Sequence, residues 1–392
     1  MRHGTWDCFS GKAMQSESLE AAIRIAIELT LLPGIGTSAQ NRIWHALPNL
    51  SGLFSMDSKH LAALGVSEEA RSAIRSRGCR ETAAEIYDWG VRENCHFLMR
   101  GKPGYPRLLE AIYDPPLILY ARGSLKALEQ HGIAVVGTRK PTIYGLQMAQ
   151  GLASDLGSRG LCVISGLARG IDAAVHRGCI EGGGMTIAVL GCGVDIIYPR
   201  EHRQLAQKIL EKGLLMSEFT PGTSPAPHNF PVRNRVISGL ALGTLVVEAS
   251  EYSGSLITAR LAMEQNREVF ALPGNLTSPQ SYGPNFLIKQ GAKLVQTWRD
   301  IVDELPPDIR REMLGQEDAK PLREPELDML SEEEIRLLEF LKPDEALQFD
   351  KIHCASRLGI SHLSNLLLNL EMRGRIRQLP GNLFVKISKQ RG

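Results

Sequence analysis

The chain has 392 residues, of which 43% are apolar and 22% are charged. This composition is that of a globular protein and excludes the disordered and fibrous classes. The length exceeds what one hydrophobic core usually serves, so we expect two or three domains. With 45 basic and 43 acidic residues, the net charge of +2 excludes a polybasic protein that coats nucleic acid by bulk charge. Any site for a polyanion must therefore be local.

The cysteines and the apolar stretches bear on the compartment. The seven cysteines are scattered and form no C-x-x-C pair, so we expect reduced thiols in a cytoplasm and no metal site. The apolar stretch at 21–32 is interrupted by Arg24 and Glu28. Because no uncharged apolar run of about 18 residues occurs, we expect neither a signal peptide nor a membrane span. Residues 1–15 have no periodicity and are assigned no structure, and Met14 is an alternative start.

Residues 19–95 show short helical patterns separated by glycine-containing turns. The segment LLPGIGTSAQNRIW resembles a helix-hairpin-helix, in which the turn from Pro33 to Gly36 lets backbone amides approach a DNA phosphate. A tight turn that only packs two helices explains the segment equally well. We expect a helical domain of the SAM-like or helix-hairpin-helix type over residues 1–97.

From residue 133 the pattern changes to strands alternating with helices. Seven runs are apolar and β-branched: IAVVGT, LCVISG, TIAVLGCG, GLLMSEF, TLVVEAS, EVFALPG and AKLVQ. Such strands predict a mainly parallel sheet covered on both faces, which is a doubly wound, Rossmann-like α/β fold with ligands beyond the carboxyl ends of the strands. The preceding segment, rich in proline and aromatic residues, reads as an extension docked on this domain, which we place at residues 98–305.

A third unit is expected near the C-terminus. Residues 306–328 are polar and contain prolines, and are interpreted as a linker. Residues 329–392 then show three helical patterns and a closing hairpin, the order of a winged helix. The exposed positions of its third helix, such as His362 and Asn365, lack Lys and Arg, so we favour partner binding or packing over DNA reading there.

Two sheet strands end in small residues followed by an arginine: Gly137, Thr138 and Arg139 after the first, and Ser165, Gly166 and Arg169 after the second. Glycine exposes backbone amides, a following helix N-terminus adds partial positive charge, and arginine is a bidentate donor for phosphate. The pattern lacks the three spaced glycines of a dinucleotide fingerprint. Both turns are therefore candidate anion sites, unless the arginines are surface residues paired to acids.

The segment HNFPVRNRVISGL places an aromatic residue beside cations: Phe230, Arg233, Asn234 and Arg235. A single nucleic-acid strand can stack its bases on such a ring while guanidinium groups hold its backbone, whereas a duplex hides its base faces. The alternative is that Phe230 belongs to the core and Arg235 to a salt bridge.

After the fifth strand, Ser253, Gly254 and Ser255 begin a helix and form another nest suited to phosphate. Glu248 and Glu251 flank it and could instead be catalytic acids of a nucleotide hydrolase. No G-x-S-x-G elbow, H-E-x-x-H motif or P-loop lysine is present. The pair Asp172 and His176, four residues apart on one helix, is interpreted as structural.

These motifs occur in order and resemble those of the bacterial DNA-processing protein A family: GTRKPTIYG, SGLARGIDAAVH, GCGVDIIYPREHRQL, SEFTPGTSPAPHNFPVRNRVISGL, VVEASEYSGSLITARLAMEQNREVFALPG and GPNFLIKQGA. The resemblance covers about residues 101–305. One departure is His202, where the family usually has Asn.

The resemblance implies a protein without catalytic residues or cofactor that binds single-stranded DNA, forms a homodimer and helps load the RecA recombinase during natural transformation. It implies that Arg139 holds backbone phosphate, that Phe230 stacks on a base, and that Arg233 and Arg235 line the same groove. The Ser165-Gly166 and Ser253-Gly254-Ser255 loops are further candidate members of this site.

The expected dimer contact is the apolar segment NFLIKQGAKLVQTW, which includes Leu287 and Ile288. The last strand of the sheet would otherwise be an exposed edge, although the placement rests mostly on the resemblance.

Two other functions stay open. One is a Rossmann-like nucleotide phosphoribohydrolase with Glu248 or Glu251 as its acid, and the other is a transcription regulator that uses the winged helix on duplex DNA.

Overall fold

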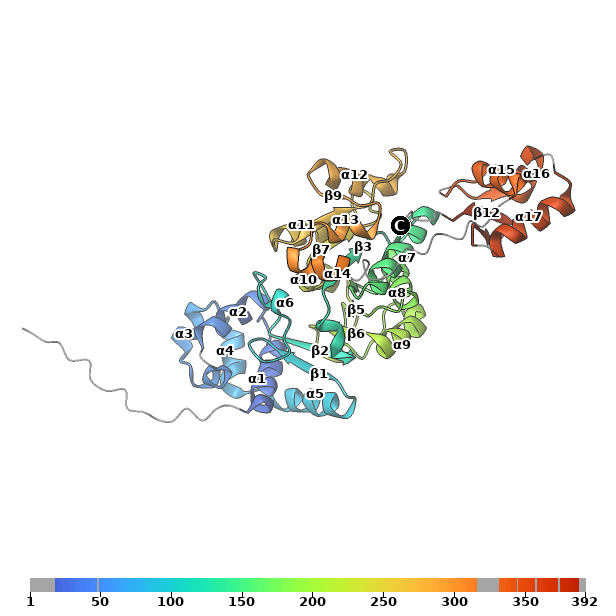
Figure 1. The fold of residues 1–392 in the computed structure, drawn as a ribbon. Helices are drawn as coiled ribbons and strands as arrows, with labels where there is room; N and C mark the ends of the chain where they lie inside the picture. Colours follow the sequence, from blue (N-terminus) through green and yellow to red (C-terminus); the bar gives the residue numbers. More distant parts are fainter. Residues whose placement is uncertain are drawn as a thin grey trace, which may run out of the picture. The chain divides into compact units, whose positions relative to one another are not determined.

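The computed structural model describes residues 18–47, 49–315, 331–343, 345–356, 358–372 and 374–387 (Figure 1). The chain divides into two compact units, one made of residues 1–100 with 116–118 and the other of residues 101–115 with 119–392. The polar start and most of the expected linker lie outside the described residues.

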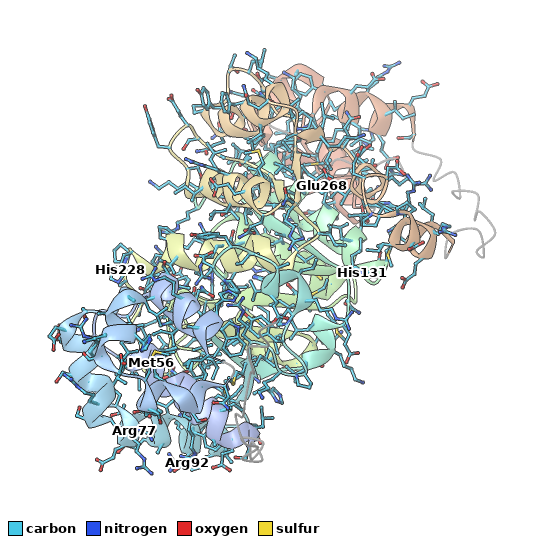
Figure 2. The ribbon with its side chains drawn as sticks, turned by 90° about the vertical axis from the view of Figure 1, so that its left-hand side faces the viewer. Met56, Arg77, Arg92, His131, His228 and Glu268 are labelled. Carbon is cyan, nitrogen blue, oxygen red and sulfur yellow. The ribbon has the colours of Figure 1, made fainter. Side chains whose placement is uncertain are left out.

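The first unit is helical, as expected. It contains α1 (Leu19–Leu31), α2 (Thr37–Ala46), the 3-10 helix η1 (Leu50–Ser55), α3 (Ser58–Ala63), α4 (Glu68–Ser76), α5 (Arg80–Arg92) and strand β1 (His96–Met99). Arg77, labelled in Figure 2, ends α4 in the left-handed conformation and donates to the buried carboxylate of Glu28 at 2.6 Å. Its guanidinium lies 3.7 Å from the centroid of the Phe54 ring. This pair joins α4 to α1, because the buried carboxylate of Glu28 would be costly without a cationic partner.

The proposed hairpin turn of the first unit is a glycine turn, with Gly34 at φ +70° and Gly36 as the N-cap of α2. A second glycine turn, with Gly65 at φ +76°, precedes α4. The positions of Gly34 and Gly65 favour glycine because residues with a side chain rarely adopt a positive φ. Contact of these turns with DNA remains a prediction.

The second unit is built on a mainly parallel sheet, which confirms the doubly wound expectation. Its strands are β2 (Ile118–Gly123), β3 (Gly132–Val136), β4 (Cys162–Ser165), β5 (Thr186–Val189), β6 (Leu214–Ser217), β7 (Gly243–Val246), β8 (Glu268–Ala271) and β9 (Lys293–Leu294). They lie in the order β2-β6-β5-β4-β3-β7-β8-β9. Only the pairing of β2 with β6 is antiparallel among these neighbours.

Helices cover both faces of this sheet. On one side lie α7 (Ile143–Ser158), α8 (Ile171–Glu181) and α9 (Arg203–Lys212), and on the other α10 (Asn229–Leu240) and α11 (Gly254–Glu264) (Figure 1). The chain winds from β3 toward β6 on the first side and returns to β7, which pairs with β3. The boundary between β3 and β7 is therefore the topological switch point, where doubly wound folds place their ligands.

The segment ahead of the sheet adds a short helix, α6 (Arg107–Glu110), and the antiparallel edge strand β2. After the sheet come α12 (Tyr282–Lys289), α13 (Trp298–Val302) and α14 (Pro307–Gly315). The expectation of a linker from residue 306 needs correction, because α14 occupies its first part and buries Met313 in the core beside α13. Pro306 and Pro307 suggested a linker, but proline is tolerated in the first turn of a helix.

The described C-terminal residues form the expected winged helix. It comprises α15 (Glu332–Phe340), β10 (Leu347–Gln348), α16 (Phe349–Ser356), α17 (Ile360–Met372), β11 (Ile376–Leu379) and β12 (Leu383–Lys386), with strand order β10-β12-β11. The leucines 363, 366, 367 and 370 are buried. The exposed face of α17 has no lysine or arginine and includes the apolar Ile360 and Leu368, and its His362 pairs with Glu333 at 2.8 Å.

The helices α7 and α8 approach each other through glycine. A methyl group at Gly178 would lie 2.1 Å from the carbonyl oxygen of Gln150, and one at Gly182 would lie 2.3 Å from that of Ser154. These contacts are backbone to backbone, so no side-chain rotation can relieve them. The spacing of the two helices therefore depends on the missing Cβ atoms.

We predict that Gly178→Ala destabilises the second unit by about 1 to 3 kcal/mol through overpacking. The matched control is Gly151→Ala in α7, where no atom lies within 4 Å of the added methyl group. This control should raise stability by up to about 1 kcal/mol because alanine is the better helix former. Thermal unfolding of both variants measures the two effects. Equal shifts in the same direction would contradict this account of the packing.

His176 is buried on α8, and its pKa falls to about 3, first because of burial and then because of the nearby charges of His202 and Arg233. Its Nδ1 lies 2.7 Å from the hydroxyl of Thr186, which donates its own proton to Val163 O. The hydroxyl must therefore accept from Nδ1–H, which leaves the buried Nε2 as the unprotonated nitrogen of the neutral ring. This geometry agrees with the structural role expected for His176.

Acid should therefore destabilise the protein through His176. Between pH 6.5 and 3 the unfolded state takes up a proton that the folded state refuses, so stability falls as the pH falls and is fully present above pH 6.5. At pH 5 the loss is about 2 kcal/mol. We predict that His176→Asn, which keeps a donor toward Thr186, loses this component. Urea unfolding at pH 7.5 and pH 5 tests it, and identical pH dependence in both proteins would refute it.

Candidate nucleic-acid interface

The candidate site lies at the carboxyl ends of β3 and β7. The turn after β3 begins at Gly137, where a Cβ atom would lie 2.6 Å from the side chain of Ile171. Thr138 N donates to Glu248 O at 2.7 Å, and Ile171 N donates to Thr138 O at 3.2 Å. These bonds fix the turn between β7 and α8, and they leave Arg139 exposed at its tip.

A cavity of about 650 Å³ opens at this point. Nine of the residues proposed from the sequence line it: Gly137, Thr138, Arg139, Phe230, Arg233, Asn234, Ser253, Gly254 and Ser255. Its charged lining consists of Arg139, Lys140 and Arg233, with Asp172 as the acid. The fold therefore brings together predicted site residues that lie more than a hundred positions apart in the sequence.

Phe230 forms the aromatic wall of the cavity. It lies in the first turn of α10 and is half-buried, so it is not a core residue. The guanidinium of Arg139 lies 5.3 Å from its ring centroid, and the ring of Tyr198 lies 5.8 Å away at a tilt of 32°. A Cβ atom at Gly191 would lie 2.7 Å from the ring. Gly191 thus makes the space in which Phe230 sits.

Arg233 lies beneath this wall and is 4% exposed. It donates to the carbonyl oxygens of Gly166, at 2.7 Å, and Val189. Burial lowers the pKa of Arg233 to about 10, opposed by the charge of Asp172. Arg233 therefore contributes positive potential from the floor, and its hydrogen bonds hold the ends of β4 and β5.

Asp172 is the acid of the cavity, at the start of α8. Its Oδ2 accepts from the amides of Gly166 and Ala168 at 3.1 and 3.3 Å. Burial raises its pKa, while Arg233 is the largest influence in the opposite direction. The carboxylate thus shapes the turn after β4 and balances Arg233, which is the structural role expected for Asp172.

The second candidate turn is placed differently. Gly166 and Arg169 line a smaller adjoining cavity of about 40 Å³, and Arg169 is paired with Glu201 at 2.6 Å, with both side chains more than half exposed. Ser165 lines neither cavity, because it is fully buried and donates to Val135 O at 2.7 Å. Ser165 therefore stabilises the sheet and is not available as a ligand.

Arg235 is also absent from both cavity linings. Its guanidinium is 5% exposed and pairs with Glu218 at 2.5 Å and Asp114 at 3.0 Å. The structure thus favours the alternative of a salt-bridged Arg235 over a groove-lining one. This ion cluster attaches α10 to the segment that precedes the sheet.

The wall opposite Phe230 is the start of α11. Ser253 is the N-cap of this helix, its hydroxyl lies 2.8 Å from that of Ser255, and no atom lies within 4 Å of a methyl group at Gly254. The amides of Ser253, Ser255 and Leu256 are bonded within this turn, while Gly254 borders open space. A helix N-terminus with neighbouring hydroxyls is suited to an anion.

The two acids considered as catalytic groups do not line the cavity. Glu248 is buried, and its carboxylate accepts from both the amide, at 2.8 Å, and the hydroxyl of Thr142, the N-cap of α7. Glu251 is exposed on the turn before α11. Glu248 thus has a structural role at the start of α7.

Several lining residues were not predicted from the sequence, among them Lys140, Tyr198 and Gln280. Lys140 follows Arg139 directly and could have been included by position. Tyr198 comes from a loop with no strand or helix signal, so only the folded chain brings it to Phe230. His202, the departure from the family pattern, is buried with Nδ1 3.0 Å from Leu167 O, and so helps to hold the turn after β4.

The described ranges contain neither a metal-binding cluster nor a membrane-spanning helix. No group of three or more His, Cys, Asp or Glu side chains is arranged to hold a metal ion in this part of the chain. No helix there is both long and apolar enough to cross a bilayer.

Comparison with known proteins gives consistent relatives. Residues 96–306 match the family model of DNA recombination-mediator protein A, and residues 320–382 match that of the DprA winged helix domain. The chain is 40% identical over 310 residues to Protein Smf of Escherichia coli (strain K12), covering 77% of this chain and 80% of that protein. It is 48% identical over 203 residues to DNA processing protein DprA of Bacillus subtilis (strain 168), covering 52% and 68%.

The fold also has a solved counterpart. The X-ray structure of DNA processing protein A from Streptococcus pneumoniae matches with a TM-score of 0.62 and 31% identity, covering 73% of this chain and 98% of that chain. The sheet order, the winged helix and both sequence matches agree. The chain therefore belongs to the DNA recombination-mediator protein A family and is a DNA recombination mediator, not an enzyme.

Proposed function

We propose that the protein binds and protects single-stranded DNA in the cavity between β3 and β7. The observation that carries the proposal is the placement of a half-exposed aromatic ring, Phe230, between the exposed Arg139 and the floor cation Arg233. Stacking surfaces combined with cations are what single-strand binding requires. A duplex cannot offer its base faces to such a ring.

The roles within the cavity follow from exposure. Arg139 and Lys140 are exposed and hold backbone phosphates, together with the amides at Gly137 and Gly254 and the hydroxyls of Ser253 and Ser255. Phe230 stacks on a base, with Tyr198 beside it. Arg233 contributes a positive electrostatic potential from the floor of the cavity. Arg235 acts at a distance by fixing α10, and Arg169 joins the site where a phosphate competes with Glu201.

We further propose that the bound strand is handed to the RecA recombinase during natural transformation. The support is the family membership together with two relatives whose names describe DNA processing. A cytoplasmic location fits this role, because Cys162, Cys179 and Cys192 are buried free thiols. We also propose the limits expected for the first two domains, residues 1–97 and 98–305, with DNA on the second.

A homodimer through the β9 edge of the sheet is part of the proposal. Of the two residues chosen from the sequence, Leu287 is buried within the protomer and Ile288 is half-buried. On the same helix, α12, the rings of Tyr282 and Phe286 stack 6.2 Å apart and are each nearly half exposed. An exposed aromatic pair beside an open sheet edge supports a contact between two copies.

The DNA proposal predicts separable effects of charge and stacking. Affinity for oligo-dT should fall with rising salt, and Arg139→Ala should reduce the slope of log affinity against log salt by about 0.7. Phe230→Ala removes a stacking surface worth roughly 1 to 3 kcal/mol, so affinity should drop with the slope unchanged. Fluorescence anisotropy over a salt series measures both quantities.

The matched control for charge is Arg260→Ala, because Arg260 lies on α11 outside the cavity and is 78% exposed. It should leave the salt slope unchanged. Equal affinity for oligo-dT and the matching duplex would contradict the proposal, as would loss of binding after deletion of residues 331–392. Steady release of base from a nucleoside monophosphate would support the hydrolase instead.

The dimer proposal predicts that Phe286→Glu lowers the mass measured by light scattering at micromolar concentration from that of two copies to one. The charge would be placed on an exposed position, so folding should be preserved. Val91→Glu, at a 58% exposed apolar position of the first unit, serves as the control and should leave the mass unchanged. A wild-type monomer, or a dimer unaffected by Phe286→Glu, would refute this contact.

A further inference from the structure

The rim of the cavity carries a second aromatic ring. Ser250 and Ser253 both line the cavity, and Ser253 N donates to Ser250 O at 3.0 Å. This bond closes a turn with Glu251 and Tyr252 at its tip. The side chain of Tyr252 is 92% exposed.

The turn that presents Tyr252 is anchored from below. Ala249 N donates to Gln280 O at 2.8 Å, and Gly283 N donates to Ala249 O at 2.8 Å. The same turn leads directly into the N-cap of α11 at Ser253. The ring is therefore carried by a turn that is bonded on both sides, next to Ser253, Gly254 and Ser255, which line the cavity.

We propose that Tyr252 is a second stacking platform, which takes a base of the strand where it leaves the cavity over the start of α11. The inference rests on the proposed binding of single-stranded DNA and adds the direction in which the strand continues. Because Tyr252 immediately precedes Ser253, a phosphate held at Ser253 and Ser255 has its neighbouring nucleotide within reach of the ring. Stacking of this kind needs no particular base, since every base has a π-face.

The charge of the turn favours a base over a backbone contact. Glu251 is exposed beside Tyr252, and its carboxylate repels phosphates. The cations Arg139 and Lys140 lie on the turn after β3, on another wall of the cavity. A strand therefore lowers its energy by turning its phosphates toward those cations and its bases toward the tip of the turn.

The surroundings also favour a nucleotide over a protein partner. Protein interfaces have an apolar centre that excludes charge and spans many residues. Tyr252 instead has a carboxylate on one side and the hydroxyl of Ser253 on the other. A lone ring flanked by polar groups suits one base.

The experiment compares wild type with Tyr252→Ala, Tyr252→Phe and the control Tyr113→Ala, using the full chain. Tyr113 is 96% exposed in the same unit but lines neither cavity. Each protein is titrated with oligo-dT of increasing length and with a fully abasic strand of matching length. Tyr252→Ala should lose roughly 5- to 100-fold in affinity for oligo-dT above a threshold length, with an unchanged salt slope. It should bind the shortest oligomers and the abasic strand as wild type does.

Tyr252→Phe keeps the ring and should bind like wild type, as should Tyr113→Ala. The inference would be overturned if Tyr252→Ala bound oligo-dT of every length with the same affinity as wild type. An equal loss of affinity of Tyr252→Ala for the abasic strand would also overturn it, because the ring would then contact the backbone of the strand. If light scattering also showed a smaller mass for Tyr252→Ala, the ring would instead contact a second copy of the chain. The proposed function fails separately if wild type does not bind oligo-dT or if Phe230→Ala and Arg139→Ala change nothing.

Discussion

The carboxylate of Glu248 is the constraint on which the site depends. It lies just beyond β7 and accepts from the amide and hydroxyl of Thr142, which in turn caps α7 through Gly145 N at 3.1 Å. Its own carbonyl oxygen accepts from Thr138 N. One residue therefore holds the end of β7 to both ends of the turn that carries Arg139. The cavity opens where these two strand ends are kept at a fixed separation.

Within that frame the cations divide by burial into two kinds. Arg233 and Arg235 are buried and fully engaged with backbone carbonyls or carboxylates, so they stabilise the fold and cannot follow a ligand. Arg139 and Lys140 are exposed and free to reorient. A fixed positive floor beneath mobile cations suits a polymer, because the floor attracts phosphates without choosing one position while the mobile groups adapt to each.

Much of the fold and of the site could be predicted from the sequence. Each apolar run predicted in the Rossmann-like region became a strand of one sheet, and the small residues at the ends of the first and fifth predicted strands line one cavity. In the sequence, the aromatic and cationic residues around Phe230 are adjacent, but residues adjacent in sequence do not lie on the same face of a helix. Phe230, Arg233, Asn234 and Ile237 recur at intervals of three and four residues and share the cavity face of α10. Arg235, two positions after Arg233, must point elsewhere.

Other features lay beyond sequence reasoning. Tyr198 meets Phe230 only because the loop after β5 folds back over α10, and Gly191 matters only because a ring lies against it. In the sequence alone Glu248 resembles an acid catalyst, because its hydrogen bonds to Thr142 join residues 106 positions apart. Periodicity describes one segment at a time and carries no information about such partners.

The sheet order has a consequence for when the site can exist during synthesis. Arg139 follows β3, but Phe230 and the start of α11 belong to the second half of the winding, and β7 pairs with β3 only after β4, β5 and β6 have been made. A ribosome-bound chain that stops before β7 contains Arg139 and Phe230 but lacks the start of α11, which forms the wall opposite Phe230. In such a fragment the cavity stays incomplete until β7 and α11 have been made. The winding order therefore delays the complete cavity until most of the second unit has been synthesised.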